Sequence, residues 1–274
     1  MDGTVGGGGH AEAILEKMQG QGIYIAMDRD SQALQEAKEK LKKFGNQVFF
    51  VQGVFSEIPE ILETLSVKEV DGILIDLGVS SFQIDEAERG FSFLREGPLD
   101  MRMNPESEDQ TAADLVNHLP EKKLEEIFQK FGEERFARRI ARAIVAIRRA
   151  EPFLTTQDLS DLIEKVVPPP FKKARARIHP ATRVFQALRI VVNQELEHLT
   201  RFLNLRLDFL KEGGRIGIIS FHSLEDRCVK QIFRQRQDFK VITKRPVQAS
   251  PDEIQMNVRS RSAKFRVAER KVFL

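Results

Sequence analysis

The sequence predicts an α/β protein in which a parallel sheet is interrupted by a run of helices. Three observations indicate this fold class: strand and helix signals alternate from 23 to 76, only helical patterns follow from 111 to 167, and a strand signal returns at 215–221. Such alternation is typical of a parallel sheet with helices on either side. We therefore expect a sheet part formed by 1–108 and 182–274, and an inserted all-helical subdomain at 109–181.

Each element of this prediction follows from a local pattern. Strands are expected where β-branched and apolar residues cluster, and helices where apolar residues recur with the helical period. The polar stretch 80–104 is expected to be a loop, and loops of that length in compact domains are usually functional. The expected strands are 23–27, 48–51, 70–76, 215–221 and a final pair ending in 265–273; the expected helices are 10–18, 31–44, 59–65, 112–118, 121–131, 133–149, 156–166, 182–211 and 223–235.

Composition narrows the class of protein. The chain has 274 residues, of which 41% are hydrophobic and 31% charged, which is typical of a folded globular protein. Its apolar runs are far shorter than the ~20 residues that cross a bilayer, and its start lacks the pattern of a secretory signal. The single cysteine, Cys228, excludes an internal disulfide and fits a reducing cytoplasm. Five scattered histidines without ligand spacing predict no catalytic metal.

Positive charge is concentrated locally although the net charge is only +2. From Lys172 to Arg189 there are six cations and no acid, and from Arg259 to Lys271 six cations stand against Glu269 alone. Unrelieved charge of this kind favours contacts with phosphates. A third group, between Arg135 and Arg149, lies near three glutamates and is interpreted as a solvated face. The residues predicted to bind RNA are Lys172, Lys173, Arg175, Arg177, Arg183, Arg259, Arg261 and Lys264.

A glycine run at 6–9 precedes the first expected helix. Glycine lets the backbone approach a ligand closely, and the start of a helix offers free amide hydrogens to an anion. Asp28 ends the next strand, where an acidic side chain in Rossmann-like folds accepts hydrogen bonds from ribose hydroxyls. The pattern predicts a nucleoside-containing cofactor, and the spacing fits a nicotinamide dinucleotide as well as S-adenosylmethionine.

Several longer motifs carry a family resemblance. The chain is similar to the bacterial 16S rRNA (cytosine-N4)-methyltransferase family, also called the RsmH or MraW type, from its first residues to its last. The motifs that match are Asp2-Gly3-Thr4-Val5-Gly6-Gly7-Gly8-Gly9-His10, Asp76-Leu77-Gly78-Val79-Ser80-Ser81-Phe82-Gln83, Glu88 to Phe93, Gly97 to Met103, His179 to Arg183, Phe185 to Arg189, Ser220 to Arg227 and Asn257 to Lys264.

The resemblance implies a class I (Rossmann-like) S-adenosylmethionine-dependent methyltransferase sheet with a helical substrate-recognition insertion. The implied reaction is methylation of N4 of a cytidine in the decoding region of 16S rRNA, and the implied partner is the small ribosomal subunit. Phe55 is by itself as readily a core residue, and Phe82 stands where the family is expected to have proline. The implied cofactor-binding residues are Gly8, Gly9 and His10 at the methionine end, Asp28 at the ribose, Phe55 beside the adenine, and Asp76 and Gln83 near the target base.

The start of the chain departs from the family. An N-terminal helix and the first sheet strand are expected before Asp2, so either the sequence is truncated or another element fills this place. Loss of a central strand is expected to expose a sheet edge and weaken the glycine loop, with lowered cofactor affinity.

Asp76 is the best candidate for catalysis. A cytosine amino group is a poor nucleophile, so the protein must orient it and accept hydrogen bonds from its hydrogens. Asp76 follows a buried strand, where ligands bind in such sheets. Elsewhere in the chain, Ser223 and Asp226 predict a capping box, and Thr182 predicts an N-cap. His222 and Arg189 stay open between structural and substrate-binding roles.

Two other functions remain open. A nicotinamide-dependent oxidoreductase would share the glycine loop and Asp28 but leaves the basic segments unexplained. A non-catalytic RNA-binding or ribosome-assembly factor becomes credible if the missing strand disables the cofactor site.

Overall fold

The computed structural model describes residues 1–168 and 179–272 and divides into two compact units. The first unit comprises Met1–Ser80 and Leu196–Leu274, and the second comprises Ser81–Glu195. These borders differ from those expected at 108/109 and 181/182, because the loop residues Leu99 and Met101 pack into the helical core of the second unit. In the part of the chain that the structure describes, no helix has the length and apolarity to cross a membrane.

The first unit alternates strands and helices, as the sequence predicts. Most bounds differ from the expected ones by one or two residues, and β4 begins earlier, at Leu210. The elements are α1 (Gly9–Met18), β1 (Tyr24–Asp28), α2 (Ser31–Leu41), a 3-10 turn (Lys42–Gln47), β2 (Val48–Gln52), a 3-10 turn (Phe55–Glu57), α3 (Ile58–Thr64), β3 (Val70–Asp76), α10 (Glu195–Asn204), β4 (Leu210–Ser220), α11 (Ser223–Gln235), β5 (Phe239–Val241), α12 (Pro251–Met256), a 3-10 turn (Val258–Ser262) and β6 (Lys264–Arg270).

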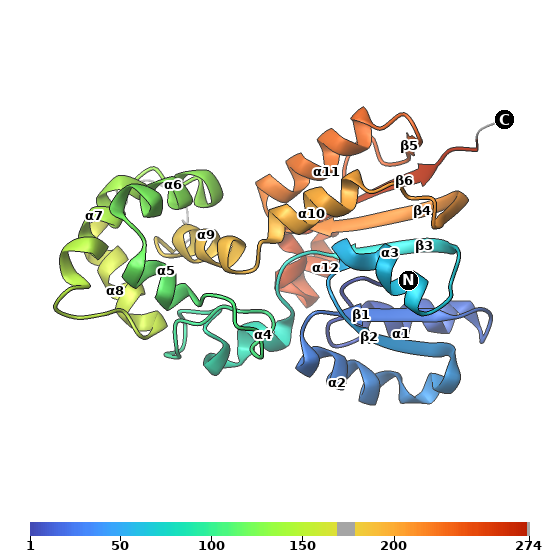
Figure 1. Cartoon of the computed structure of the whole chain (residues 1–274), viewed down its shortest axis with the longest axis horizontal. Helices are drawn as coiled ribbons and strands as arrows, with labels where there is room; N and C mark the ends of the chain where they lie inside the picture. Colours follow the sequence, from blue (N-terminus) through green and yellow to red (C-terminus); the bar gives the residue numbers. More distant parts are fainter. Residues whose placement is uncertain (169–178, 273–274) are drawn as a thin grey trace. The chain divides into compact units, whose positions relative to one another are not determined.

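The strands follow one another in the order β2, β1, β3, β4, β6, β5 (Figure 1). β1 pairs with β2 and β3 with β4 in parallel, whereas β6 runs antiparallel to both β4 and β5. Residues 1–3 lie between β1 and β3: the Asp2 amide donates to Ile25 O at 2.8 Å, and the Gly3 amide donates to Leu74 O at 2.9 Å. The position between β1 and β3 is therefore occupied by these residues, which bridge the two halves of the sheet.

Alternate residues of β1 enter different cores. Tyr24 and Ala26 pack with the apolar faces of α1 and α2, whereas Ile25 and Met27 pack with residues of α3 and α10. A strand buried on both sides in this way is typical of a doubly wound parallel sheet. This topology confirms the Rossmann-like α/β sheet with a helical insertion that the sequence predicts.

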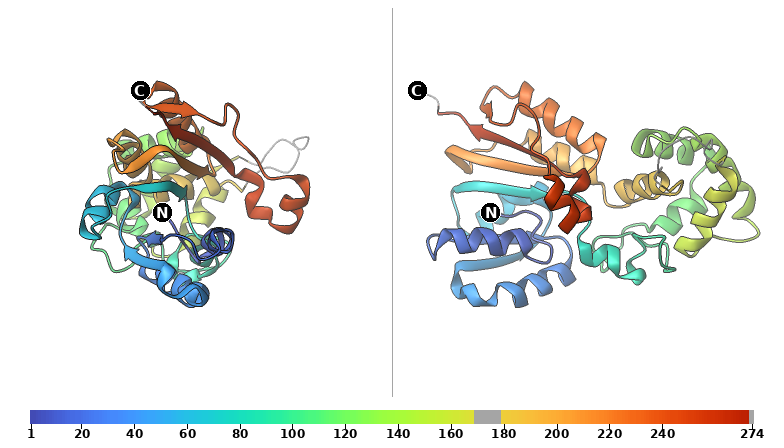
Figure 2. Two further views of the ribbon diagram at one scale, coloured as in Figure 1. Left: turned by 90° about the vertical axis from the view of Figure 1, so that its right-hand side faces the viewer. Right: turned by 180° about the vertical axis from the view of Figure 1, so that it is seen from behind.

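The second unit consists of helices, and among its described residues there is no β-strand. Its core joins Leu124 and Phe128 of one helix, Ile140 and Ile144 of another and Leu188 of a third. Its elements are α4 (Ser81–Asp85), a 3-10 turn (Ala87–Arg89), α5 (Ala112–His118), α6 (Glu121–Gly132), α7 (Ala137–Ile147), α8 (Thr156–Val166) and α9 (Thr182–Val192), which Figure 2 shows from two further sides.

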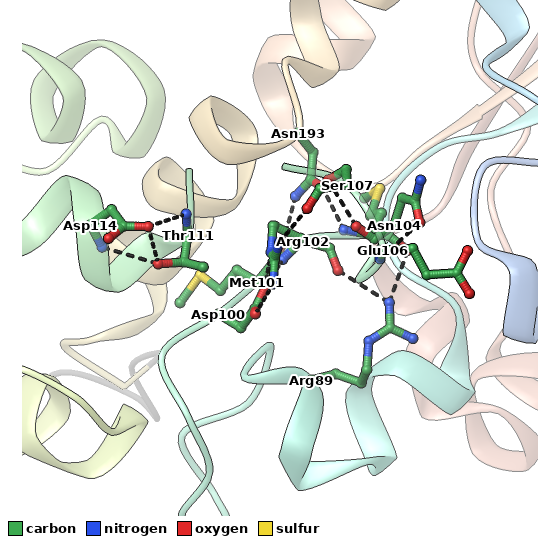
Figure 3. Close-up of polar contacts among 11 residues, drawn as sticks. Arg89, Asp100, Met101, Arg102, Asn104, Glu106, Ser107, Thr111, Asp114 and Asn193 are labelled. Carbon is green, nitrogen blue, oxygen red and sulfur yellow. Dashed lines mark hydrogen bonds and ion pairs between the residues drawn. The ribbon is translucent and has the colours of Figure 1, made fainter. Parts of the chain in front are cut away.

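The long helix expected over 182–211 is wrong. The chain forms α9 and α10 instead, separated at Asn193 and Gln194, where Gln194 adopts a left-handed φ of 50°. The Asn193 side chain accepts from Met103 N and donates to Met101 O, both at 2.7 Å (Figure 3). The predicted Thr182 cap is also wrong, because Ala181 holds the N-cap position and Thr182 is the first helical residue.

Candidate active site

The glycine run forms a sharp turn into α1. Gly6 and Gly8 have φ values of 51° and 80°, a region that favours glycine, and Gly8 is the N-cap of the helix. A Cβ on Gly8 would also lie 3.4 Å from the Leu41 side chain. The turn therefore favours glycine because of its left-handed conformation, and it leaves the first amides of α1 without side-chain caps.

Asp28 holds this turn from the end of β1. Its Oδ2 accepts from the Gly6 amide at 2.9 Å, and its Oδ1 accepts from the Asp30 amide at 2.9 Å. Burial raises the pKa of Asp28 to about 6, against the lowering effect of these two amides. Each carboxylate oxygen has a second lone pair, so the group keeps acceptor capacity for ligand hydroxyls.

Asp76 stands at the carboxyl end of β3 with one oxygen unused. Its Oδ1 is buried and has no hydrogen-bond partner, while its Oδ2 lies 3.4 Å from His10 Nε2. The backbone amide of Asp76 donates to Thr4 Oγ1 at 2.6 Å, which ties the strand end to the segment before the glycine turn. The Asp76 carboxylate raises the pKa of His10, whose side chain is 58% exposed. A buried acceptor without a donor indicates a ligand position.

These residues meet at one edge of the sheet. The glycine turn, Asp28 and Asp76 all follow the carboxyl ends of parallel segments, which is where ligands bind in open α/β sheets. The glycine turn, Asp28 and the unused Asp76 oxygen fit a cofactor that brings an anionic group, ribose hydroxyls and a cationic or amine group. The structure thus brings together Gly8, Gly9, His10, Asp28 and Asp76.

Phe55 lies in the turn after β2 and is partly buried. Its ring contacts Phe202 edge to face, with centroids 5.8 Å apart, so part of its surface belongs to the core. The neighbouring Ser56 is fully buried, and its hydroxyl lies 2.8 Å from His198 Nδ1 on α10. Burial lowers the pKa of His198. Sequence reasoning missed this pair, since nothing local connects residues so far apart in the chain.

Gln83 is in the second unit. It lies on α4 and is 4% exposed. Its assignment to the cofactor site, which lies in the first unit, is a proposal.

The predicted capping box at α11 is shifted by one residue. His222 is the N-cap: its Nδ1 accepts from the Glu225 amide at 3.3 Å, while Glu225 Oε2 accepts from the amides of His222 and Phe221. Asp226 instead pairs with Arg266 at 2.7 Å and with Lys264 at 3.6 Å, which lowers its pKa. His222 Nδ1 therefore caps the helix, while its Nε2 lies 3.1 Å from Glu225 Oε1. The expected Ser223 and Asp226 box is wrong.

The predicted RNA-binding residues have different surroundings. Arg259 and Arg261 are exposed, and Lys264 is half-buried beside Asp226. Arg183 donates to the Glu133 carbonyl at 3.1 Å, and Arg189 pairs with Glu195 at 2.8 Å, which favours the acid-pairing role for Arg189. Lys172, Lys173, Arg175 and Arg177 lie outside the described residues.

Comparisons with known proteins agree in pointing to one family. The model of the MraW methylase family matches residues 1–271. A relative from Pelobacter propionicus is 50% identical and covers 98% of this chain and 91% of that protein. Relatives from Syntrophobacter fumaroxidans and Persephonella marina are each 47% identical, cover 98% of this chain, and are covered to 89% and 92%. All three relatives are named ribosomal RNA small subunit methyltransferase H.

Proposed function

The chain belongs to the MraW methylase family, and we propose that it methylates N4 of a cytidine in the decoding region of 16S rRNA, with S-adenosylmethionine as the methyl donor. The coarser activity, a small-subunit rRNA methyltransferase, is supported by relatives of that name along almost the whole chain. The site of action would be the cytoplasm, where small subunits are assembled. The single observation that carries the proposal is the buried, unpartnered Oδ1 of Asp76 at the edge where the glycine turn lies.

In this proposal, different residues of the pocket bind different parts of the cofactor. Amides at the start of α1 face the anionic end of the cofactor, and Asp28 accepts from its ribose hydroxyls. His10 lies next to Asp76, Phe55 flanks the adenine, and Gln83 completes the site near the base in this proposal. When bound, S-adenosylmethionine would supply a methyl group from its positively charged sulfur, and the sulfur would leave as a neutral thioether when the bond to the methyl group breaks.

Asp76 acts on the amino group of the target base. Its free oxygen accepts a hydrogen bond from N4, which turns the nitrogen lone pair toward the methyl group. The N4 hydrogens become more acidic as the new N–C bond forms, so this hydrogen bond strengthens in the transition state. Asp76 then takes up the proton that N4 releases, and His10, 3.4 Å away and largely exposed, lies between Asp76 and solvent.

We assign the contacts with RNA to two groups of basic residues, one in each compact unit. Arg259, Arg261 and Lys264 belong to the first unit, and Arg183 with the basic stretch 172–177 belongs to the helical insertion. In this proposal, the helical insertion, expected over 109–181, recognises the substrate. Phosphate contacts of this kind supply affinity and position more than sequence choice.

Transfer of labelled methyl from S-adenosylmethionine to small subunits tests the proposal. Subunits should come from cells that lack the gene, and their nucleosides should then be separated by mass spectrometry. We expect label in N4-methylcytidine with the wild-type protein and none with Asp76→Ala. Label in another nucleoside would overturn the N4 assignment, and binding of subunits without any product would favour an assembly factor. Binding of NAD in preference to S-adenosylmethionine would favour an oxidoreductase.

A further inference from the structure

One face of α7 is covered with arginines. The arginine face consists of five exposed residues, and the helix buries Ala137, Ile140, Ala141 and Ile144 on its other side. Arg138, Arg139 and Arg142 lie on α7 and, at 3.6 residues per turn, fall within an arc of about 100°. Arg135 lies in the turn before the helix and Arg149 in the turn after it. The members of the arginine face are Arg135, Arg138, Arg139, Arg142 and Arg149.

Nothing in the described part of the chain neutralises this face. None of its members forms an ion pair there, and the only contact of a charged group is that of Arg135 with the Phe136 ring, at 4.5 Å. The sequence has no acid between Glu134 and Glu151. Glu134 is 7% exposed and accepts from the Phe136 amide, so it serves the helix start and not the arginines. The sequence suggested a solvated face whose positive charge is balanced by nearby glutamates. Glu134 does not support that interpretation, because its carboxylate is buried at the helix start.

A sixth arginine in the same stretch shows what a structural role looks like. Arg148 Nη1 donates to the carbonyls of Val116 and Leu119, at 2.8 and 2.6 Å, and so satisfies the end of α5. Its guanidinium is half-buried, whereas the arginine face points away from the core. Fold stability therefore accounts for Arg148 and not for the other five.

We propose that the arginine face binds the phosphate backbone of RNA. Like charges three and four residues apart on a helix repel one another, so an unpaired set of this size costs stability until an anion approaches. The planar guanidinium matches two phosphate oxygens at once. The inference rests on the proposed function, because it takes rRNA as the ligand, and it adds a contact surface to those assigned to 172–177, Arg183 and 259–264.

The test compares two triple substitutions that remove the same charge. The first is Arg138→Gln, Arg139→Gln and Arg142→Gln. The control is Lys17→Gln, Lys38→Gln and Lys42→Gln, three exposed lysines of the first unit. The dissociation constant for small ribosomal subunits is measured by filter binding at several salt concentrations, together with the dissociation constant for S-adenosylmethionine.

We expect the arginine triple to weaken subunit binding by about tenfold or more at 0.1 M salt. The slope of log affinity against log salt should shrink by roughly 2 to 3, as expected for three lost phosphate contacts. The lysine triple should keep the wild-type slope, and both triples should bind S-adenosylmethionine normally. Replacing the three arginines with lysine should preserve most of the slope, which separates loss of charge from loss of structure.

Three results would overturn the inference. They are an unchanged slope in the arginine triple, an equal loss in the lysine triple, and tighter binding of polyglutamate than of RNA by the wild-type protein. A wild-type protein that binds subunits through these arginines but leaves N4 unmethylated would support the inference and defeat the proposed reaction, so the two can be told apart.

Discussion

Two buried polar sites, one in each compact unit, differ in whether their hydrogen bonds are satisfied. In the second unit, Arg89 is 6% exposed and donates to the carbonyls of Arg102 and Met103, at 3.1 and 2.8 Å. The Asn193 side chain forms hydrogen bonds with the backbone of the same loop (Figure 3). In the first unit, Asp76 keeps a buried oxygen without a partner. The difference teaches how to separate roles: satisfied buried groups hold a loop in shape, whereas an unsatisfied one indicates where a ligand binds.

The sharpest test of this contrast is Asp76→Asn, which keeps the shape of the side chain. We expect the rate of methyl transfer to fall by about a hundredfold or more, because the N4 proton loses its acceptor. Binding of S-adenosylmethionine should change much less. The matched control is Asp71→Asn on the same strand, since Asp71 is exposed and pairs with Lys211 at the surface. A folded Asp76→Asn protein with near-normal turnover would refute the assignment.

Asn193→Ala tests whether the satisfied buried hydrogen bonds of the second unit stabilise the fold. The substitution leaves the Met103 amide and the Met101 carbonyl without this partner, and it should lower the free energy of unfolding by about 2 to 4 kcal/mol. Urea denaturation measures the loss. Asn204→Ala is the control, because Asn204 is exposed and donates to the Thr200 carbonyl. Equal stability of the two variants would contradict a supporting role for Asn193.

The pH dependence of cofactor binding tests Asp28. Burial raises the pKa of Asp28 from 3.8 to about 6, and ribose hydroxyls need the ionised form as acceptor. Affinity for S-adenosylmethionine should be constant above pH 7 and fall by about tenfold per pH unit well below pH 6. Calorimetry between pH 5 and 8 measures it. Asp28→Asn should bind weakly at all pH values, and a pH-independent wild-type affinity would count against this role.

The raised pKa of Asp28 makes folding stability fall with rising pH, whereas it makes cofactor affinity rise. A carboxyl whose pKa is raised in the folded state contributes stability below pH 3.8, and this contribution is lost as the pH rises through about 6. Asp2 is 1% exposed and its pKa is also raised to about 6 by burial. The unliganded protein should therefore become less stable across the window in which it begins to bind cofactor.

The smallest effect is expected at Cys228. Its thiol is half-buried on α11 and lies 3.6 Å from Thr200 Oγ1, a weak contact. Cys228→Ala should change the free energy of unfolding by less than about 1 kcal/mol and leave methyl transfer intact. A large loss of activity would show that the first unit has a second polar group on which the reaction depends.

Strand positions and the site carboxylates were accessible from sequence because each carboxylate ends an apolar run. The runs that end at Asp28 and Asp76 mark buried strands, and parallel sheets collect ligand residues at strand ends. The family motifs then indicated which cofactor these carboxylates would meet.

Contacts between distant residues were not accessible. The break after α9 is hidden by an apolar pattern that continues past it, and it depends on Asn193 reaching Met101 and Met103. The cap of α11 uses a histidine nitrogen, whereas the Ser223 and Asp226 pattern sits one residue away and Asp226 is drawn to Arg266. Both errors come from tertiary contacts that override a local rule.

The pairing of β3 with β4 has a consequence for how the protein is made. Ile73 lies opposite Ile216, so the hydrogen-bonding edge of β3 must wait while the whole second unit leaves the ribosome. Pairings this remote in sequence form slowly, and an open strand edge can recruit a neighbouring chain in the meantime. β6 is translated after the other described strands and must still enter between β4 and β5. Nascent chains stalled before β6 should therefore depend on chaperones.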